Sequence, residues 1–262
     1  YLEANGYSCD ALELIDPEEY SSGEQRPLVL SEEQSAAYAT LCELIDSGEL
    51  GEVYHVYASF RSHRSIPGIG GDFTIKAKAG GGSLIDWGVH FIDLILYCCM
   101  DPKPITASGE AFCKLGKDMK NYVYESMWAE DTKDIENGVN DVDDLITGYI
   151  RTDKASISFN GAWAQNIFVP ETYIDFIGTK GGIRLKYGAD FELFTVTNGK
   201  LTTEKPEFDN TVNMFNQEIN HFIDCIRSGE HIRSHIDKAE ITARIMQGIY
   251  DSAELGREVS FE

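Results

Sequence analysis

Apolar residues recur every three or four positions in four segments of the chain, which is the spacing of one face of a helix. The first pattern begins at Ser31 or Ser35 and stops at Ser47-Gly48, a pair typical of a helix end. We therefore predict helices over residues 31–46, 83–100, 212–228 and 238–255.

Segments rich in β-branched and aromatic residues lie between these helices, separated by turn sequences such as Thr197-Asn198-Gly199-Lys200. The predicted strands cover residues 27–30, 52–60, 105–113, 144–152, 155–164, 173–178, 182–187, 191–197 and 258–261. Such a run of successive strands predicts an α+β fold, with a large, open, mainly antiparallel β-sheet and helices packed on one face. Residues 115–140 are polar and acidic, and we predict a loop or an insertion there.

Composition excludes several classes of protein. The chain has 262 residues and is 42% hydrophobic, so it can bury a sizeable core and is not a disordered polypeptide. Its apolar runs are shorter than the roughly 18 residues that suggest a membrane span. The net charge of −22 repels phosphate backbones and anionic lipids, which argues against nucleic-acid and membrane partners. The six cysteines are scattered without a C-x-x-C pair, so we expect free thiols and a cytoplasmic location.

The strongest candidate for chemistry follows the three glycines at residues 80–82. Asp86, His90 and Asp93 are spaced four and three residues apart, so on a helix they project from one face. A carboxylate one turn from an imidazole orients the ring and suits it to remove a hydroxyl proton as a general base. The structural alternative is that Asp86 caps the helix and His90 is a satisfied core residue.

Two weaker candidates lie at strand ends. Arg61, His63 and Arg64 form a basic cluster where a strand meets a loop, and they either bind polar groups of a substrate or make surface salt bridges. Trp163 either packs in the core or stacks on a sugar ring at the wall of a pocket.

Several segments resemble one family in the expected order. The string G-G-G-S-L-I-D-W-G-V-H-F-I-D-L, from Gly80 onward, resembles the signature of the substrate domain of the Gfo/Idh/MocA oxidoreductases, the family of glucose-fructose oxidoreductase and inositol dehydrogenase. Residues 44–53, 160–163, 177–182 and 249–259 resemble further segments of that domain. The resemblance extends from about residue 28 to the end.

This resemblance implies one half of a two-domain enzyme, in which an N-terminal Rossmann domain binds NAD or NADP and the C-terminal domain binds a sugar, cyclitol or related polyol or glycoside. His90 is then the acid/base at the reacting carbinol, with Asp86 as its partner and a substrate hydrogen-bond acceptor. Asp93, Arg61, His63 and Trp163 are the expected substrate-binding residues. By the same resemblance, Gly80 and Gly81 are expected near the nicotinamide, and the protein is expected to form a homodimer or homotetramer through its sheet.

Two family motifs are missing from the start of the chain. No G-x-G-x-x-G follows a strand there, and no Glu-Lys-Pro upstream of Gly80 supplies the family's lysine; the Glu-Lys-Pro at residues 204–206 lies far downstream. We therefore interpret residues 1–34 as the end of an upstream Rossmann-type domain and residues 35–262 as the α+β substrate-binding and oligomerisation domain. The non-Met start favours a missing upstream part over its loss from the gene, and the chain alone is expected to be inactive.

Three functions remain open from the sequence. The first is the substrate-binding and catalytic-base portion of an NAD(P)-dependent oxidoreductase that acts by hydride transfer. The second is a non-catalytic sugar-binding or assembly subunit that has lost the cofactor domain. The third, a metal-dependent lyase or isomerase, would use Asp86, His90 and Asp93, with His63, to hold a divalent ion; our prediction is that there is no metal site.

Overall fold

The computed structural model describes residues 32–99, 101–187, 190–206, 214–230, 232 and 234–261. These residues belong to one compact unit, Ser31–Glu262. The strand expected at 27–30 and most of the expected domain 1–34 lie outside the described residues, so both stay predictions.

Five α-helices are described. Their bounds are α1 Glu32–Asp46, α2 Lys76–Ala79, α3 Val89–Cys98, α4 Met214–Ser228 and α5 Ile236–Leu255. Nine strands accompany them: β1 Val53–Arg61, β2 Pro104–Phe112, β3 Leu145–Thr152, β4 Ser156–Ala162, β5 Glu171–Gly178, β6 Gly182–Lys186, β7 Phe191–Thr197, β8 Lys200–Glu204 and β9 Val259–Ser260.

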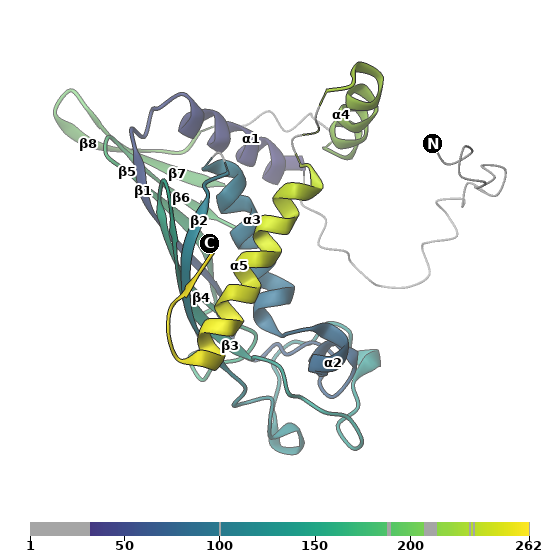
Figure 1. Ribbon diagram of the computed structural model, residues 1–262. Coiled ribbons are helices and arrows are strands. Elements are labelled where there is room, and N and C mark those ends of the chain that lie inside the picture. Colours follow the sequence, from purple (N-terminus) through teal and green to yellow (C-terminus); the bar gives the residue numbers. More distant parts are fainter. Residues whose placement is uncertain are drawn as a thin grey trace. The chain divides into compact units, whose positions relative to one another are not determined.

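The strands form one open sheet in the order β8-β7-β6-β5-β1-β4-β3-β2-β9 (Figure 1). All neighbouring strands run antiparallel except β1 and β4, which are parallel. This confirms the predicted α+β class with a large, mainly antiparallel sheet. The parallel pair is the exception that matters for the site, because both of its strands end at the same edge of the sheet.

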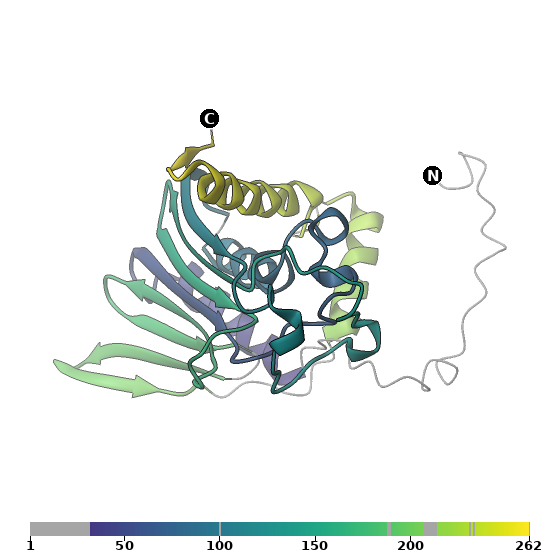
Figure 2. The same ribbon diagram turned by 90° about the horizontal axis from the view of Figure 1, so that it is seen from below.

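The helices α1, α3 and α5 cover one face of this sheet (Figure 2). Side chains alternate along each strand, so Val56, Ala58 and Phe60 of β1 are buried under the helices, beside Ile157 and Phe159 of β4. The helices contribute Leu41, Cys42, Ile45, Ile92, Ile95, Ile245 and Ile249 to the same core. The opposite face of the sheet carries the polar and exposed members of each strand.

The polar segment 115–140 has a small core of its own. Its helical structure is limited to two short 3₁₀ turns, Met119–Asn121 and Glu130–Thr132. Tyr122 is buried against Ile66 and Ile69, and the cluster also includes the indole of Trp163. The segment predicted as a loop or insertion therefore packs against the end of β4.

Three elements differ from the sequence prediction, and one of them is the four-residue helix α2, which was not expected. The turn at residues 197–200 was expected, but the strand β8 that follows it was not, because Lys200–Glu204 is mostly polar. The helix expected over 83–100 begins instead with a π-helical turn, Leu84–Gly88, before α3. Within the described part of the chain, no helix is long and apolar enough to cross a membrane.

The glycine at position 161 tests the packing of this core. A Cβ atom on Gly161 would lie 1.9 Å from Cε2 of Phe60, a ring that is fully buried between Phe91 and Phe159. Since the ring has no free space to enter, we expect Gly161→Ala to lower the free energy of unfolding by about 2 kcal/mol. Urea denaturation measures this difference.

A matched control is available in β6. A Cβ on Gly182 would approach only the Phe176 carbonyl oxygen, at 3.2 Å. Gly182→Ala should therefore change the unfolding free energy by less than about 0.5 kcal/mol. Equal midpoints for the two variants would show that the Phe60 ring is not confined as described.

Candidate active site

The candidate site begins where a π-helical turn joins α3. The backbone N–H of Val89 donates to the carbonyl of Leu84, five residues back, which defines the π geometry. Asp86 lies within this turn, whereas His90 and Asp93 lie in α3. The uniform α-helix expected from the spacing is therefore wrong at Asp86, and such single π turns are frequent at functional sites.

A buried carboxylate, Asp143, holds the start of this turn. Its Oδ1 accepts hydrogen bonds from the Gly82 N–H at 2.8 Å and the Tyr250 hydroxyl at 2.6 Å. Its Oδ2 accepts from the Ser83 hydroxyl at 2.8 Å and the Leu84 N–H at 3.0 Å. Asp143 is 5% exposed, so these four donors replace the water that a carboxylate would otherwise bind.

The Tyr250 hydroxyl completes the network. It comes from α5 and also lies 3.3 Å from the Gly82 nitrogen, whose N–H points to it. Burial and the neighbouring Asp143 charge raise the pKa of Tyr250 far above its ordinary value. The phenol therefore stays protonated and serves as a hydrogen-bond donor to Asp143.

Asp86 is held by the indole of Trp163. The Trp163 Nε1 donates to Asp86 Oδ2 at 2.9 Å. Burial raises the pKa of the Asp86 carboxyl above its ordinary value, and the Trp163 hydrogen bond and the charge interaction with His90 lower it only in part. Asp86 is therefore a half-buried carboxylate whose orientation is fixed by Trp163. Its second oxygen, Oδ1, takes no part in the Trp163 hydrogen bond.

Trp163 reaches Asp86 because it directly follows β4. Its backbone N–H donates to the Asp144 carbonyl at 2.9 Å, and its own carbonyl accepts from Ser65, in the segment after β1. The side chain of Asp144 anchors the neighbouring loop by accepting from the N–H groups of Lys114 and Gly116, both at 2.8 Å. The carboxyl ends of the two parallel strands thus meet beside Asp86.

The other members of the Asp-His-Asp motif have different surroundings. His90 is exposed on the first turn of α3, one helical turn from Asp86. Asp93 is also exposed, and it accepts a hydrogen bond from Thr242 of α5 at 2.9 Å. The structure thus brings Asp86 and His90 into electrostatic contact, while Asp93 joins α3 to α5.

Trp163 is 1% exposed. Its observed role is to orient Asp86 from the core, and stacking on a sugar would require its ring to become accessible. His63 lies in the segment after β1, where its Nδ1 is 3.2 Å from the Glu125 carboxylate and its ring meets Phe168 edge to face. The proposed substrate contacts of both residues stay predictions.

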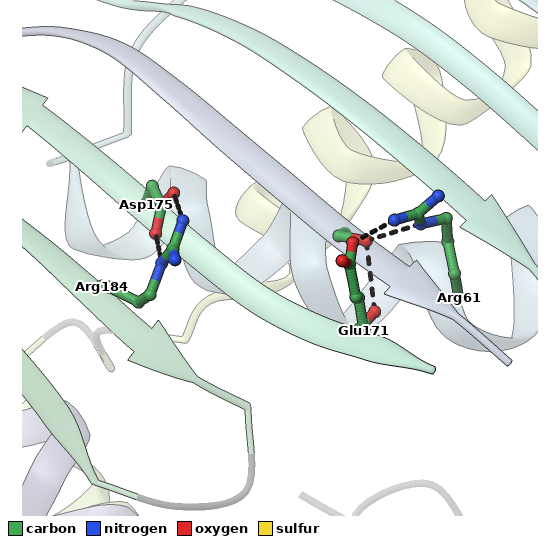
Figure 3. Close-up of polar contacts among 5 residues, drawn as sticks. Arg61, Glu171, Asp175 and Arg184 are labelled. Atoms are coloured by element: carbon green, nitrogen blue, oxygen red, sulfur yellow. Dashed lines mark hydrogen bonds and ion pairs between the residues drawn. The ribbon is translucent and has the colours of Figure 1, made fainter. Parts of the chain in front are cut away.

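Arg61 lies on the other face of the sheet. It forms an ion pair with Glu171, its opposite residue on β5, and its Nε donates to the Ser59 hydroxyl (Figure 3). Alternation along β1 places these groups opposite buried Phe60, away from the helix side that carries Asp86. The structure therefore does not bring Arg61 together with Asp86, and its substrate role stays a prediction.

The three glycines do not form a dinucleotide-binding turn. They connect α2 to the π-helical turn, whereas a Rossmann phosphate turn connects a strand to a helix. The Gly80 N–H donates to the Lys76 carbonyl, the Gly82 N–H donates to Asp143, and a Cβ on Gly81 would collide with the Tyr250 hydroxyl. These residues therefore do not fit the pyrophosphate of NAD(P), and the expected place of Gly80 and Gly81 near the nicotinamide stays a prediction.

Two cavities lie near the site. One of about 220 Å³ is bounded by the end of α3 and the start of α5, and the other, of about 120 Å³, lies beside Gly81, Cys113 and Tyr250. Neither is lined by Asp86 or His90. Among the described residues, no group of three or more His, Cys, Asp or Glu side chains is arranged to hold a metal ion.

The sequence reasoning missed Asp143, Asp144 and Tyr250. The two aspartates stand at the end of an acidic segment whose other members are mostly exposed, so their residue type resembles a solvated surface. One signal was present: the two aspartates stand side by side immediately before the strand β3, beyond the polar segment.

Comparison with known proteins shows the family of this chain. The profile of the GFO/IDH/MocA C-terminal domain matches residues 38–184. D-glucoside 3-dehydrogenase from Escherichia coli (strain K12) is 26% identical over 219 residues, covering 84% of this chain and 60% of that protein. This chain therefore belongs to the GFO/IDH/MocA family and contains its C-terminal domain.

Solved structures share the fold. The aldose-aldose oxidoreductase from Caulobacter crescentus, complexed with glycerol, has a TM-score of 0.65 and 19% identity, covering 88% of this chain and 62% of that one. A levoglucosan dehydrogenase complexed with NADH and levoglucosan has a TM-score of 0.68 and 16% identity, covering 87% of this chain and 64% of that one. This chain therefore spans less than two thirds of the length of these relatives.

The raised pKa of Asp86 predicts a pH-dependent effect on stability. Because the native pKa lies above the ordinary value of 3.8, the native state favours protonated Asp86. The stabilisation from this proton is fully present below 3.8 and is lost as the pH rises through the native pKa. At pH 7 the ionised Asp86 therefore destabilises the fold.

Asp86→Asn removes this charge and keeps an oxygen that accepts from Trp163. We expect the variant to unfold at a higher urea concentration than the parent at pH 7, with the difference shrinking as the pH falls toward 4. Asp131→Asn, at an exposed position, is the control and should show no such trend. Equal or lower stability of Asp86→Asn at pH 7 would contradict the described burial.

Proposed function

We propose that this chain is the substrate-binding and catalytic-base portion of an NAD(P)-dependent oxidoreductase that oxidises a hydroxyl of a sugar, cyclitol or glycoside. One observation carries the proposal: Asp86, half-buried and oriented by Trp163, lies one helical turn from the exposed imidazole of His90. The proposal is also supported by the family membership, and by similar proteins that are named as dehydrogenases of a glucoside and of levoglucosan.

The proposed roles follow from exposure. His90 is accessible to solvent and accepts the proton that leaves the substrate hydroxyl. Asp86 accepts a hydrogen bond from the substrate and holds it beside the imidazole of His90. Trp163 positions Asp86, and Asp93 supports α3 through Thr242.

NAD(P), when bound, supplies the acceptor for the hydride of the carbinol carbon. Since the described glycines do not form a pyrophosphate site, we place the dinucleotide on residues outside those described here. The chain without such residues is therefore expected to be inactive. We also propose a reducing cytoplasmic location, in keeping with six scattered cysteines that form no C-x-x-C pair.

We further propose that two copies associate through the helix-free face of the sheet. Tyr57 near the centre and Val196 of β7 are 49% and 60% exposed there, and Leu201 of β8 is 90% exposed. Polar groups between them are already paired, as in the Asp175–Arg184 ion pair at 2.6 Å (Figure 3). Exposed apolar side chains beside satisfied polar groups are typical of an interface between subunits.

The activity prediction concerns His90. In the complete protein, we expect His90→Asn to lower kcat by at least about a hundredfold, because the proton acceptor is lost, while NADH binding persists. Steady-state kinetics and NADH fluorescence titration measure the two quantities. His221→Asn, at an exposed position of α4, is the matched control and should retain full turnover.

Two results would contradict the proposal. An unchanged kcat in His90→Asn would remove His90 from the chemistry. Sugar binding by the complete protein with no NADH response would instead support the alternative of a non-catalytic binding subunit.

The association prediction is tested by sedimentation velocity. We expect the parent protein to sediment as a dimer or larger assembly, and Tyr57→Glu/Val196→Glu to dissociate because charges would be buried without partners. Val123→Glu changes an even more exposed apolar residue, off the sheet, and should leave the assembly intact. A parent monomer, or a double variant that still assembles, would contradict this interface.

A further inference from the structure

Three cysteines gather where α1 packs on α3. Cys42 comes from α1, Cys98 ends α3, and Cys99 follows it. The sulfur atoms of Cys42 and Cys98 are 3.2 Å apart, and these residues are 3% and 0% exposed. Two thiols 56 positions apart in sequence are thus in direct contact inside the core.

We propose that Cys42 and Cys98 are a site of reversible oxidation, at which a two-electron thiol oxidant converts the pair into a disulfide between α1 and α3. The sulfur atoms need to approach by only about 1 Å, because a disulfide bond is about 2.05 Å long. Each thiol gives up one hydrogen atom and the S–S bond forms. A diazene oxidant such as diamide takes up both hydrogens and becomes the hydrazine.

Cys98, and not its neighbour Cys99, is the partner of Cys42. The Cys98 sulfur is the one in direct contact with the Cys42 sulfur, at 3.2 Å. Burial raises the pKa of Cys99 to about 12, and because Cys42 and Cys98 are also buried, this sulfur–sulfur contact is what selects the pair. The Cys99 backbone carbonyl also accepts a hydrogen bond from Lys154, away from the pair.

The Cys42–Cys98 disulfide would affect the candidate site because the site lies in the segment between the two cysteines. The loop between Cys42 and Cys98 contains β1, the π-helical turn with Asp86, and His90. A cross-link that closes such a loop restricts the unfolded chain and stabilises the folded one. The oxidised protein would therefore have α1 tied to the helix that carries His90.

Both thiols are buried, so oxidation requires a local opening of α1. The reaction should be slow with the folded protein, and accessible thiols should be modified first. Because this inference rests on packing alone, it holds whether or not the proposed oxidoreductase function is correct.

The experiment treats the folded protein with diamide, blocks the remaining thiols in denaturant and maps the peptides by mass spectrometry. We expect a Cys42–Cys98 cross-linked peptide that dithiothreitol removes. The cross-linked protein should melt about 5–10 °C above the reduced protein. Cys98→Ala should abolish the cross-link and this increase, whereas Cys99→Ala should keep both.

Three outcomes would overturn the proposal. They are no Cys42–Cys98 peptide in the parent, a cross-link that survives Cys98→Ala by moving to Cys99, and a cross-link that forms only after unfolding. If Cys98→Ala fails to fold, the peptide map of Cys99→Ala alone tests the proposal. That variant still contains Cys42 and Cys98 and lacks Cys99, the alternative partner of Cys42.

Discussion

The geometry of the candidate site depends on one buried carboxylate. Asp143 accepts four hydrogen bonds, from two backbone N–H groups, a serine hydroxyl and the Tyr250 phenol. A carboxylate removed from water is costly unless its oxygens are paired, and the start of the π-helical turn supplies most of the pairing. The same bonds satisfy N–H groups that the beginning of a helix leaves without partners. The carboxylate and the N–H groups at the start of the turn therefore satisfy each other's need for a hydrogen-bond partner.

The parallel pair β1 and β4 supplies the second half of the arrangement. Because these strands end at the same edge of the sheet, the segments that follow them lie close together. The buried indole of Trp163, directly after β4, can therefore donate its hydrogen bond to Asp86. The small core built by residues 115–140 fills the space around the Trp163 indole. The segment 115–140 thus contributes to the site through packing, and the side chain of Asp144 anchors its start through the Gly116 N–H. His90 remains the exposed member, which is the condition for contact with a substrate.

Much of the sheet could be predicted from sequence, because alternation and β-branched residues mark β1 and β3 to β7 strongly. The strand β8 could not, since its polar residues pair only along an edge. The π-helical turn leaves no side-chain pattern, so Asp86 and His90 could be found by spacing but their geometry could not. The Asp86–Trp163 bond joins residues 77 positions apart, and Asp143 reaches Tyr250 across 107 positions. Contacts of that range follow from the sheet topology and not from local pattern.

The most direct test of this account is amide hydrogen exchange in Asp143→Asn. An asparagine side chain keeps one acceptor oxygen where the carboxylate has two, so the Gly82 and Leu84 N–H groups cannot both remain bonded. We expect exchange at least about tenfold faster at one or both of these amides, with β1 and β4 unchanged. Asp141→Asn, at a neighbouring exposed carboxylate that accepts from the Lys76 N–H, should leave both amides as they are. Unchanged exchange at Gly82 and Leu84 in Asp143→Asn would contradict the claim that this carboxylate holds the site.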